Sequence, residues 1–295
     1  MNRSAINHRE TRWRIAIMLI CFFLRHSAAA AGEGHPIRFA PLPMENRETV
    51  VKQFEPMVQY LEKHLQQPIE MVYSDSYEEI IEKFIAGGID IAYLGPLPYI
   101  ELRGKYHQAE PLVHFNEQSG KPKYTCAIVT MADSALDLGR LNGRRIALTQ
   151  PLSTCGYLSV AGMLRDRGSD LEDNSYRYLD KHDNVALAVV RGEFDAGGLK
   201  TAIAKKYSHL GLIIAAETPE LPGFGLVANR ANLPEATVQA LRELLTATET
   251  TITGQAMKKA WGDNIRYGAV PASDADYEPV RLLKGDAVIP TRNKE

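Results

Sequence analysis

Length, composition and charge describe an ordinary soluble globular protein. The chain has 295 residues, of which 45% are hydrophobic and 24% are charged, so it can bury one large core or two modest ones. The formal net charge of -2 provides no broad cationic field, which excludes nucleic acid and anionic membranes as expected partners. Any anion must therefore be bound by a local site.

The first 31 residues have the pattern of a secretory signal peptide. Four arginines between positions 3 and 14 precede an apolar run over residues 15–24, and small residues follow at 27–31. Arg25 and His26 interrupt the apolar run well before the roughly 20 residues that a membrane anchor needs. We therefore expect an exported mature protein that begins near Ala31 or Gly32.

Short apolar runs alternate with helical periodicity from Ile37 onward, which predicts βαβ units and mainly parallel sheets. In the first part of the chain we expect strands at 37–40, 69–73 and 89–94. Helices are expected at 48–65, at 77–85 behind a cap at Asp75 or Ser76, and after Gly95-Pro96.

The second part repeats this alternation, with strands expected at 124–130, 145–148, 176–179, 194–197 and 211–215. A strand at 225–228 then precedes a helix for which Asn232 is the predicted cap and Glu235 its reciprocal partner. The simplest organisation has two lobes, the first from residues 32–123 and 221–295 and the second from 124–220. Such a chain crosses between lobes twice, and a ligand is expected in the cleft.

The segment Ser153-Thr154-Cys155-Gly156 lies between a predicted strand and a predicted helix. Free amides and the positive end of a helix dipole favour an anion there, and two hydroxyls can donate at the same point. The alternative is an ordinary helix cap, which Ser and Thr often provide.

Three further loops contain candidate donors to the same ligand. Tyr93, before Gly95, and Tyr77, at a helix start, offer hydroxyls, although either can instead be a packed aromatic residue. His182 precedes a helix that Asp183 can cap, and as an imidazolium it would neutralise part of an oxyanion's charge.

These loops, in this order, resemble the PhnD-like family of periplasmic phosphonate, phosphate and phosphite binding proteins, the substrate-binding components of ABC importers. The matching segments are YEEII at 77–81, DIAYLGP at 90–96, PLSTCGY at 151–157, HDNVALAV at 182–189 and GEFDAG at 192–197. The resemblance implies a type II periplasmic-binding-protein fold and a monomer in the periplasm. It also implies binding without catalysis, cofactor or metal, and an ABC permease as partner.

The resemblance also implies which residues hold the ligand. By this resemblance Tyr77, Ser153, Thr154 and His182 are donors to phosphoryl-type oxygens, Cys155 and Gly156 complete the loop, and Tyr93 lines the pocket from the first lobe. Members that bind aminoalkylphosphonates hold the ammonium with acidic residues. Because Phe224 and a position near Ala202 replace them here, we expect an oxyanion without an amine.

Besides Phe224, Cys155 also departs from the family pattern, because the family has a hydroxyl at this position. Cys155 can pair with Cys126, since an oxidising compartment permits a disulfide, or both can remain thiols. A Cys155 thiolate at a helix start favours a thiophilic ligand such as arsenite, and hence a sensor that signals to a membrane histidine kinase. An enzyme with Cys155 as nucleophile and His182 as base is disfavoured, because no third residue orients them.

Overall fold

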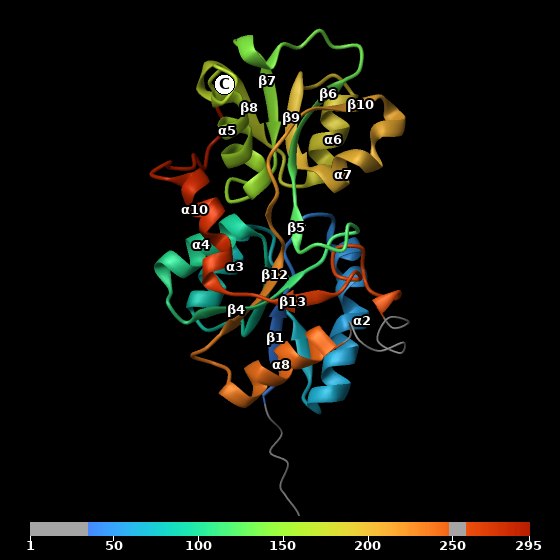
Figure 1. Cartoon of the computed structure of the whole chain (residues 1–295), viewed down its shortest axis with the longest axis vertical. Coiled ribbons are helices and arrows are strands. Elements are labelled where there is room, and N and C mark those ends of the chain that lie inside the picture. The colour runs from blue at the N-terminus through green and yellow to red at the C-terminus, as the bar shows by residue number, and fades with distance from the viewer. Residues whose placement is uncertain (1–34, 248–257) are drawn as a thin grey trace, which may run out of the picture. The chain divides into compact units, whose positions relative to one another are not determined.

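The computed structural model describes residues 35–247 and 258–295, so the predicted signal peptide lies outside the described residues. Residues Pro36–Glu295 form one unit. In the described ranges, no helix is both long enough and apolar enough to span a bilayer. The chain within this unit is built around two main sheets (Figure 1).

Six strands of the described chain form the first sheet, in the order β13-β4-β12-β3-β1-β2. They are β1 Ile37–Ala40, β2 Ile69–Met71, β3 Ile91–Leu94, β4 Ala109–Phe115, β12 Gly225–Asn229 and β13 Ala269–Pro271. The helices that accompany them are α2 Arg47–Leu65, α3 Tyr77–Ile85, α4 Pro96–Lys105, α8 Glu235–Ala247 and α10 Glu278–Lys284. The large core of the molecule packs on this sheet.

The second sheet has five strands among the described residues, in the order β10-β6-β9-β7-β8. They are β6 Cys126–Met131, β7 Arg145–Leu148, β8 Ser175–Tyr178, β9 Ala196–Lys200 and β10 Leu212–Glu217. The accompanying helices are α5 Ser159–Arg165, α6 His182–Val190 and α7 Thr201–Lys206. Two smaller apolar clusters pack around this sheet.

The prediction of mainly parallel sheets is wrong, because both sheets are mixed. In the first sheet β1 is parallel to β2 and β3, whereas β12 is antiparallel to both β3 and β4. In the second sheet β7 is parallel to β8 and β9, whereas β6 is antiparallel to β9 and β10. The physical reason lies in how the chain enters these strands. Parallel neighbours need a crossover connection, usually a helix, whereas β6 and β12 follow directly on the connections between the sheets.

A two-stranded ladder marks these connections. β5, Lys123–Tyr124, precedes the second sheet and pairs antiparallel with β11, Leu221–Pro222, which follows it. The tail of the chain makes a third passage in addition to the two predicted. Lys294 pairs with Tyr176 of β8 through two backbone bonds of 2.9 Å, and Tyr178 donates to the Pro290 carbonyl at 2.6 Å. Residues 290–294 therefore lie on the second sheet and not in the predicted first lobe.

Of the three helix caps predicted from the sequence, the one for α3 is observed and those for α6 and α8 are not. The Ser76 hydroxyl accepts from the Glu79 amide and caps α3, as predicted. The helix α6 begins at His182, so Asp183 lies in its first turn and is not the cap.

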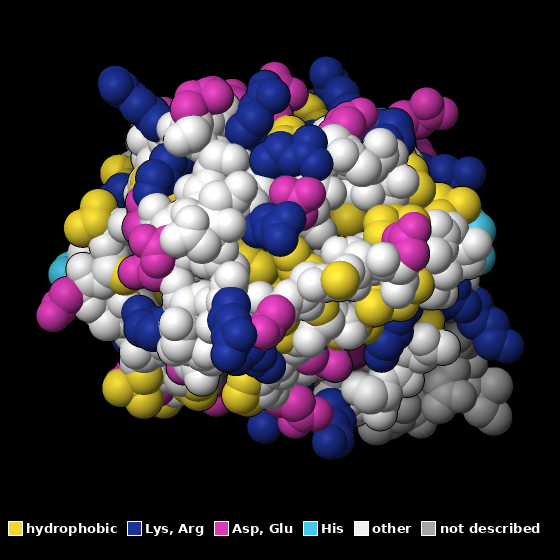
Figure 2. Space-filling model, turned by 90° about the horizontal axis from the view of Figure 1, so that it is seen from above, with side chains coloured by type: hydrophobic (Ala, Val, Ile, Leu, Met, Phe, Trp, Pro, Cys, Tyr) yellow, Lys and Arg dark blue, Asp and Glu magenta, His cyan; other side chains and the backbone are white. Residues whose placement is uncertain are grey.

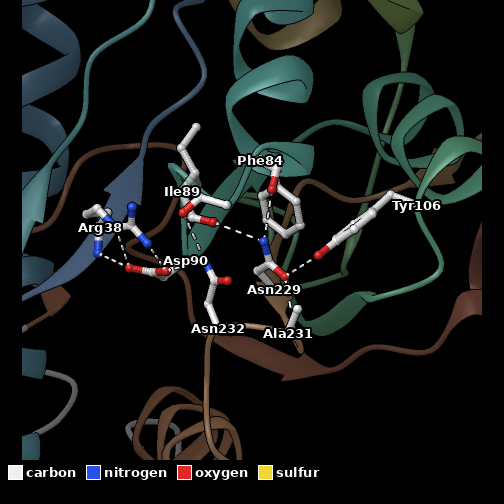
Figure 3. Close-up of polar contacts among 9 residues, drawn as sticks. Arg38, Phe84, Ile89, Asp90, Tyr106, Asn229, Ala231 and Asn232 are labelled. Atoms are coloured by element: carbon white, nitrogen blue, oxygen red, sulfur yellow. Dashed lines mark hydrogen bonds and ion pairs between the residues drawn. The ribbon is translucent and has the colours of Figure 1, made fainter. Parts of the chain in front are cut away.

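Asn232 does not cap α8, which begins three residues later at Glu235, and its side-chain NH2 group binds elsewhere (Figure 3). It donates to the Asp90 carboxylate at 2.7 Å and to the Gly87 carbonyl at 3.1 Å, and Asp90 is itself held by Arg38. The helix instead starts at Glu235, whose carboxylate pairs with Arg230. Asn232 therefore belongs to a partly exposed polar network next to β3, whose buried member is Asp90.

Candidate oxyanion pocket

A narrow pocket, whose walls leave no room for a water-sized molecule between them, lies where loops of the two sheets meet. The first-sheet wall consists of Leu42, Tyr77, Gly95, Pro98 and Phe224. The second-sheet wall consists of Ser153, Thr154, Cys155 and His182, and Tyr124 of β5 joins the two. Five of the seven predicted site residues thus meet in one pocket, although they come from three separate segments of the chain.

The loop that follows β7 provides most of the second-sheet wall. It forms a π-helical turn, Thr154–Leu158, which runs directly into α5. Gly156 lies behind this wall and does not line the pocket. A Cβ at Gly156 would lie 2.8 Å from the Thr149 hydroxyl and 3.1 Å from the Gln150 carbonyl, so glycine allows the loop to fold back on itself. The role of Gly156 in the structure is therefore close backbone packing.

A second glycine supports this loop from the sheet. A Cβ at Gly198 of β9 would lie 2.8 Å from the Cys155 carbonyl and would overlap the Val160 side chain. The bare backbone at this position lets the π-helical turn approach β9 closely. The predicted strand at 194–197 ended just before this residue.

Cys155 and Cys126 form a disulfide, with their Cα atoms 5.0 Å apart. The bond joins the π-helical turn to the first residue of β6 and closes a loop across 29 positions of sequence. Of the two arrangements that the sequence left open, the structure has the disulfide. A sulfur in this state is not a thiolate, so the predicted role of Cys155 as a soft ligand is corrected to that of a structural link.

Two tyrosine hydroxyls are available at the pocket. The hydroxyls of Tyr77 and Tyr124 are buried close to the side chains of Ser153 and Thr154 respectively, but neither makes a hydrogen bond of good geometry within the described residues. Burial raises the pKa of both phenols, so both keep their protons at neutral pH. A buried donor without a partner carries a desolvation cost, which a ligand oxygen would relieve.

Thr154 connects the two walls. Its hydroxyl accepts a hydrogen bond of 3.0 Å from the backbone amide of Leu97, in the first turn of α4. Because that bond uses an oxygen lone pair, the hydroxyl proton remains available to a ligand. Nearby, the side chain of Gln150 accepts from the Tyr77 amide at 2.8 Å. The loops of the two sheets are thus hydrogen-bonded at the pocket itself.

His182 is a neutral donor and not the imidazolium that the sequence suggested. Its side chain is 1% exposed, and burial, together with the positive charge of Lys200, lowers the pKa of His182 to about 3. Its Nδ1 atom accepts from the Lys200 amide at 3.1 Å. The proton of the neutral ring must therefore be on Nε2.

Tyr93 does not line the pocket, contrary to the prediction. Its ring stacks on Phe224 with centroids 5.5 Å apart, so Phe224 lies between it and the ligand space. The Tyr93 hydroxyl donates to the Asn264 carbonyl at 3.5 Å. The alternative of a packed aromatic residue, which the sequence also allowed, is the one observed.

Sequence reasoning missed Tyr124 as a pocket residue. It lies where the chain first passes between the sheets, at the boundary that the sequence predicted, and an aromatic hydroxyl at such a boundary is the signal that was available. Phe224 was recognised as a change from the family pattern, but not as the wall that covers Tyr93.

Charge of one sign does not dominate the face of the molecule seen in Figure 2. On the side shown in Figure 2, Lys and Arg side chains are interspersed with Asp and Glu. Within the described parts of the chain, no group of three His, Cys, Asp or Glu side chains is placed to hold a metal ion. The donors at the pocket are therefore hydroxyl and imidazole groups.

Comparison with known proteins identifies the family. The model of the family described as the periplasmic substrate-binding protein of the phosphonate ABC transporter matches residues 39–277. This chain belongs to that family, which confirms the resemblance found in the sequence. The family is one of periplasmic substrate-binding proteins of ABC transporters for phosphonate.

Two curated relatives cover most of the chain. The phosphate-import protein PhnD of Mycolicibacterium smegmatis is 26% identical over 86% of this chain and 87% of its own length. The phosphonates-binding periplasmic protein of Escherichia coli is 24% identical over 87% of this chain and 78% of its own length.

A solved structure supports the fold. The complex of PhnD1 from Prochlorococcus marinus with methylphosphonate has a TM-score of 0.74 at 16% identity, over 85% of this chain and 97% of that chain. At this identity the likeness shows the fold alone, and it confirms the two-lobed type II architecture that the sequence predicted.

Proposed function

We propose that this protein binds a small oxyanion in the pocket, as the substrate-binding component of an ABC importer, without catalysing a reaction. The observation that carries the proposal is the set of donors around one enclosed space. The hydroxyls of Tyr77 and Tyr124 lack partners, and Nε2–H of His182 comes from the opposite wall. Donors without acceptors call for an acceptor-rich ligand.

The lining of the pocket favours phosphate, phosphite or a small phosphonate without an amine. The first-sheet wall presents Leu42, Pro98 and Phe224, which can contact an alkyl group but offer nothing to an ammonium. Because a buried ammonium needs a carboxylate or several acceptors, an aminoalkylphosphonate is disfavoured.

The disulfide weakens the two alternatives that depended on Cys155. Arsenite sensing required a thiolate ligand and an enzyme required a thiolate nucleophile, whereas the sulfur is bonded to Cys126. Binding in the periplasm and delivery to a membrane permease remain the function that the pocket and the family support together.

Calorimetry on the mature chain tests the proposal. Phosphate, phosphite and methylphosphonate are titrated, with 2-aminoethylphosphonate and arsenite as comparison ligands. We expect at least one of the first three to bind in the micromolar range or tighter, and arsenite to bind only after the disulfide is reduced, if at all. Binding of none of the three would refute the proposed function. Tight arsenite binding to the oxidised protein would instead support a sensor that does not use a thiolate.

A further inference from the structure

A buried lysine stands directly behind the pocket. The Lys200 side chain is 1% exposed, and its ammonium lies 4.9 Å from the ring centre of Phe224 and 5.5 Å from that of Tyr124. Both rings line the pocket, and their centroids are 5.0 Å apart. The ammonium thus lies against two aromatic side chains that line the pocket.

Two further contacts tie Lys200 to the site. Its backbone amide donates to His182 and so determines which ring nitrogen of His182 carries the proton. Its ammonium forms a 2.6 Å ion pair with Glu117 and lies 3.4 Å from the Asn264 side chain. Glu117 is 18% exposed and follows β4 of the first sheet, so the ion pair links the two sheets beside the pocket.

The donors that line the pocket carry no positive charge, and Lys200 is a cation close enough to stabilise an anion there. Tyr77, Tyr124, Thr154 and His182 are all neutral, because burial keeps the phenols protonated and the imidazole uncharged. Enclosing a dianion among neutral groups alone is costly, whereas a cation a few ångströms away lowers that cost. The ammonium acts on the pocket across the rings of Phe224 and Tyr124, whose centres lie 4.9 and 5.5 Å from it.

Charged side chains also surround Lys200 on the side of a second cavity. This cavity is lined by Glu117, Gln118, Ser119, Lys123, Tyr124, Thr125, Lys200, Thr201, Ala202, Lys205 and Glu220. Three lysines and two glutamates face it, and the buried Thr201 hydroxyl on its wall has no partner in the described chain.

We propose that Lys200 determines ligand specificity: its ammonium favours doubly charged phosphonate or phosphate ligands and rejects those with a cationic substituent, while Glu117 moderates that charge. This inference rests on the proposed function and specifies the class of ligand for the same pocket. Lys200 acts through the aromatic wall and does not touch the ligand. Its effect is therefore on charge preference more than on the shape of the pocket.

The experiment compares two ligands that differ by an ammonium, methylphosphonate and 2-aminoethylphosphonate, by calorimetry at pH 8. In wild type, methylphosphonate is expected to bind at least tenfold more tightly. In Lys200→Met, the ratio of the two dissociation constants should shift by about tenfold toward the amine, through weaker methylphosphonate binding. Lys205→Met, which removes an exposed lysine from the second cavity, is the matched control and should leave the ratio unchanged.

Glu117→Gln separates charge from a purely structural link. The substitution breaks the same ion pair but leaves the lysine charged, so methylphosphonate should bind as tightly as in wild type or more tightly. If Glu117→Gln weakens binding as much as Lys200→Met, the pair is a structural link and the inference is wrong. The inference is also wrong if Lys200→Met and Lys200→Arg both keep the wild-type ratio of the two dissociation constants.

Two outcomes separate this inference from the function on which it rests. Wild type that binds no phosphate, phosphite or methylphosphonate refutes the proposed function, and the inference with it. Wild type that binds methylphosphonate, combined with an unchanged ratio in Lys200→Met, refutes the inference alone. Because the readout is a ratio within one variant, a partial loss of folded protein does not produce it; thermal unfolding of each ligand-free variant checks that the variant folds.

Discussion

The two walls of the pocket differ in what they offer a ligand. The second-sheet wall presents two hydroxyls and an imidazole, held by a disulfide and by the glycine backbone at Gly198. The first-sheet wall presents apolar surface and a single hydroxyl, that of Tyr77. The difference indicates that the second-sheet wall binds the oxyanion and that the first-sheet wall selects the group attached to it. Substitutions should therefore affect the two walls unequally.

Removal of the disulfide should have the largest effect. Cys126→Ser combined with Cys155→Ser is expected to lower the free energy of unfolding by about 3–4 kcal/mol, because a bridge across about 30 residues restricts the unfolded chain. Urea denaturation measures this, with reduced wild type as the matched control. A double variant as stable as oxidised wild type would show that the second-sheet wall does not depend on this link.

His182 should make the same wall sensitive to acid. Its folded pKa of about 3 lies below the unfolded value near 6.5, so below pH 6.5 the unfolded chain takes up a proton that the folded chain refuses. Stability is therefore lost as the pH falls from 6.5 toward 4, by about 2–3 kcal/mol from this residue. His182→Gln should lose less stability over that interval in urea titrations. Parallel curves for the two proteins would contradict the neutral, buried state.

Thr154→Val tests the point where the walls meet. The change removes a donor to the ligand and leaves the Leu97 amide without its acceptor, so oxyanion affinity should fall by about 100-fold. Calorimetry measures the loss, and Thr154→Ser, which keeps the hydroxyl, is expected to restore most of the affinity. Equal losses in both variants would mean that the methyl group, and not the hydroxyl, is what matters.

Tyr77→Phe should have the smallest effect and opposite consequences for binding and stability. Loss of one donor should weaken oxyanion binding by about tenfold, while the ligand-free protein should be as stable as wild type or slightly more stable, because a buried hydroxyl without a partner disappears. Tyr93→Phe is the control from the same side of the pocket. Its hydroxyl lies behind Phe224, so affinity should not change. If Tyr93→Phe weakened binding as much, the placement of these two rings would be wrong.

Local pattern predicted most elements, and it failed where a connection or a distant partner intervened. Helices α2 and α3 and strands β1 and β7 lie within a residue or two of their predicted ranges, because hydrophobic period and capping residues are local. The directions of β6 and β12 depend on how the chain passes between sheets, which no local pattern encodes. The Asn232 side chain donates to Asp90, a partner 142 positions away, and α8 begins at Glu235, so Asn232 is not its cap.

The sequence by itself determined the family, the alternation of strands and helices, and the segments that carry Tyr77, Ser153, Thr154 and His182. These follow from residue type and spacing along the chain. Only the tertiary structure decided that Tyr93 lies behind Phe224, that Cys155 is bonded to Cys126, that His182 is neutral and that Lys200 stands behind the pocket. Each of these depends on burial and on distances between residues far apart in sequence, and such distances exist only once the chain has folded.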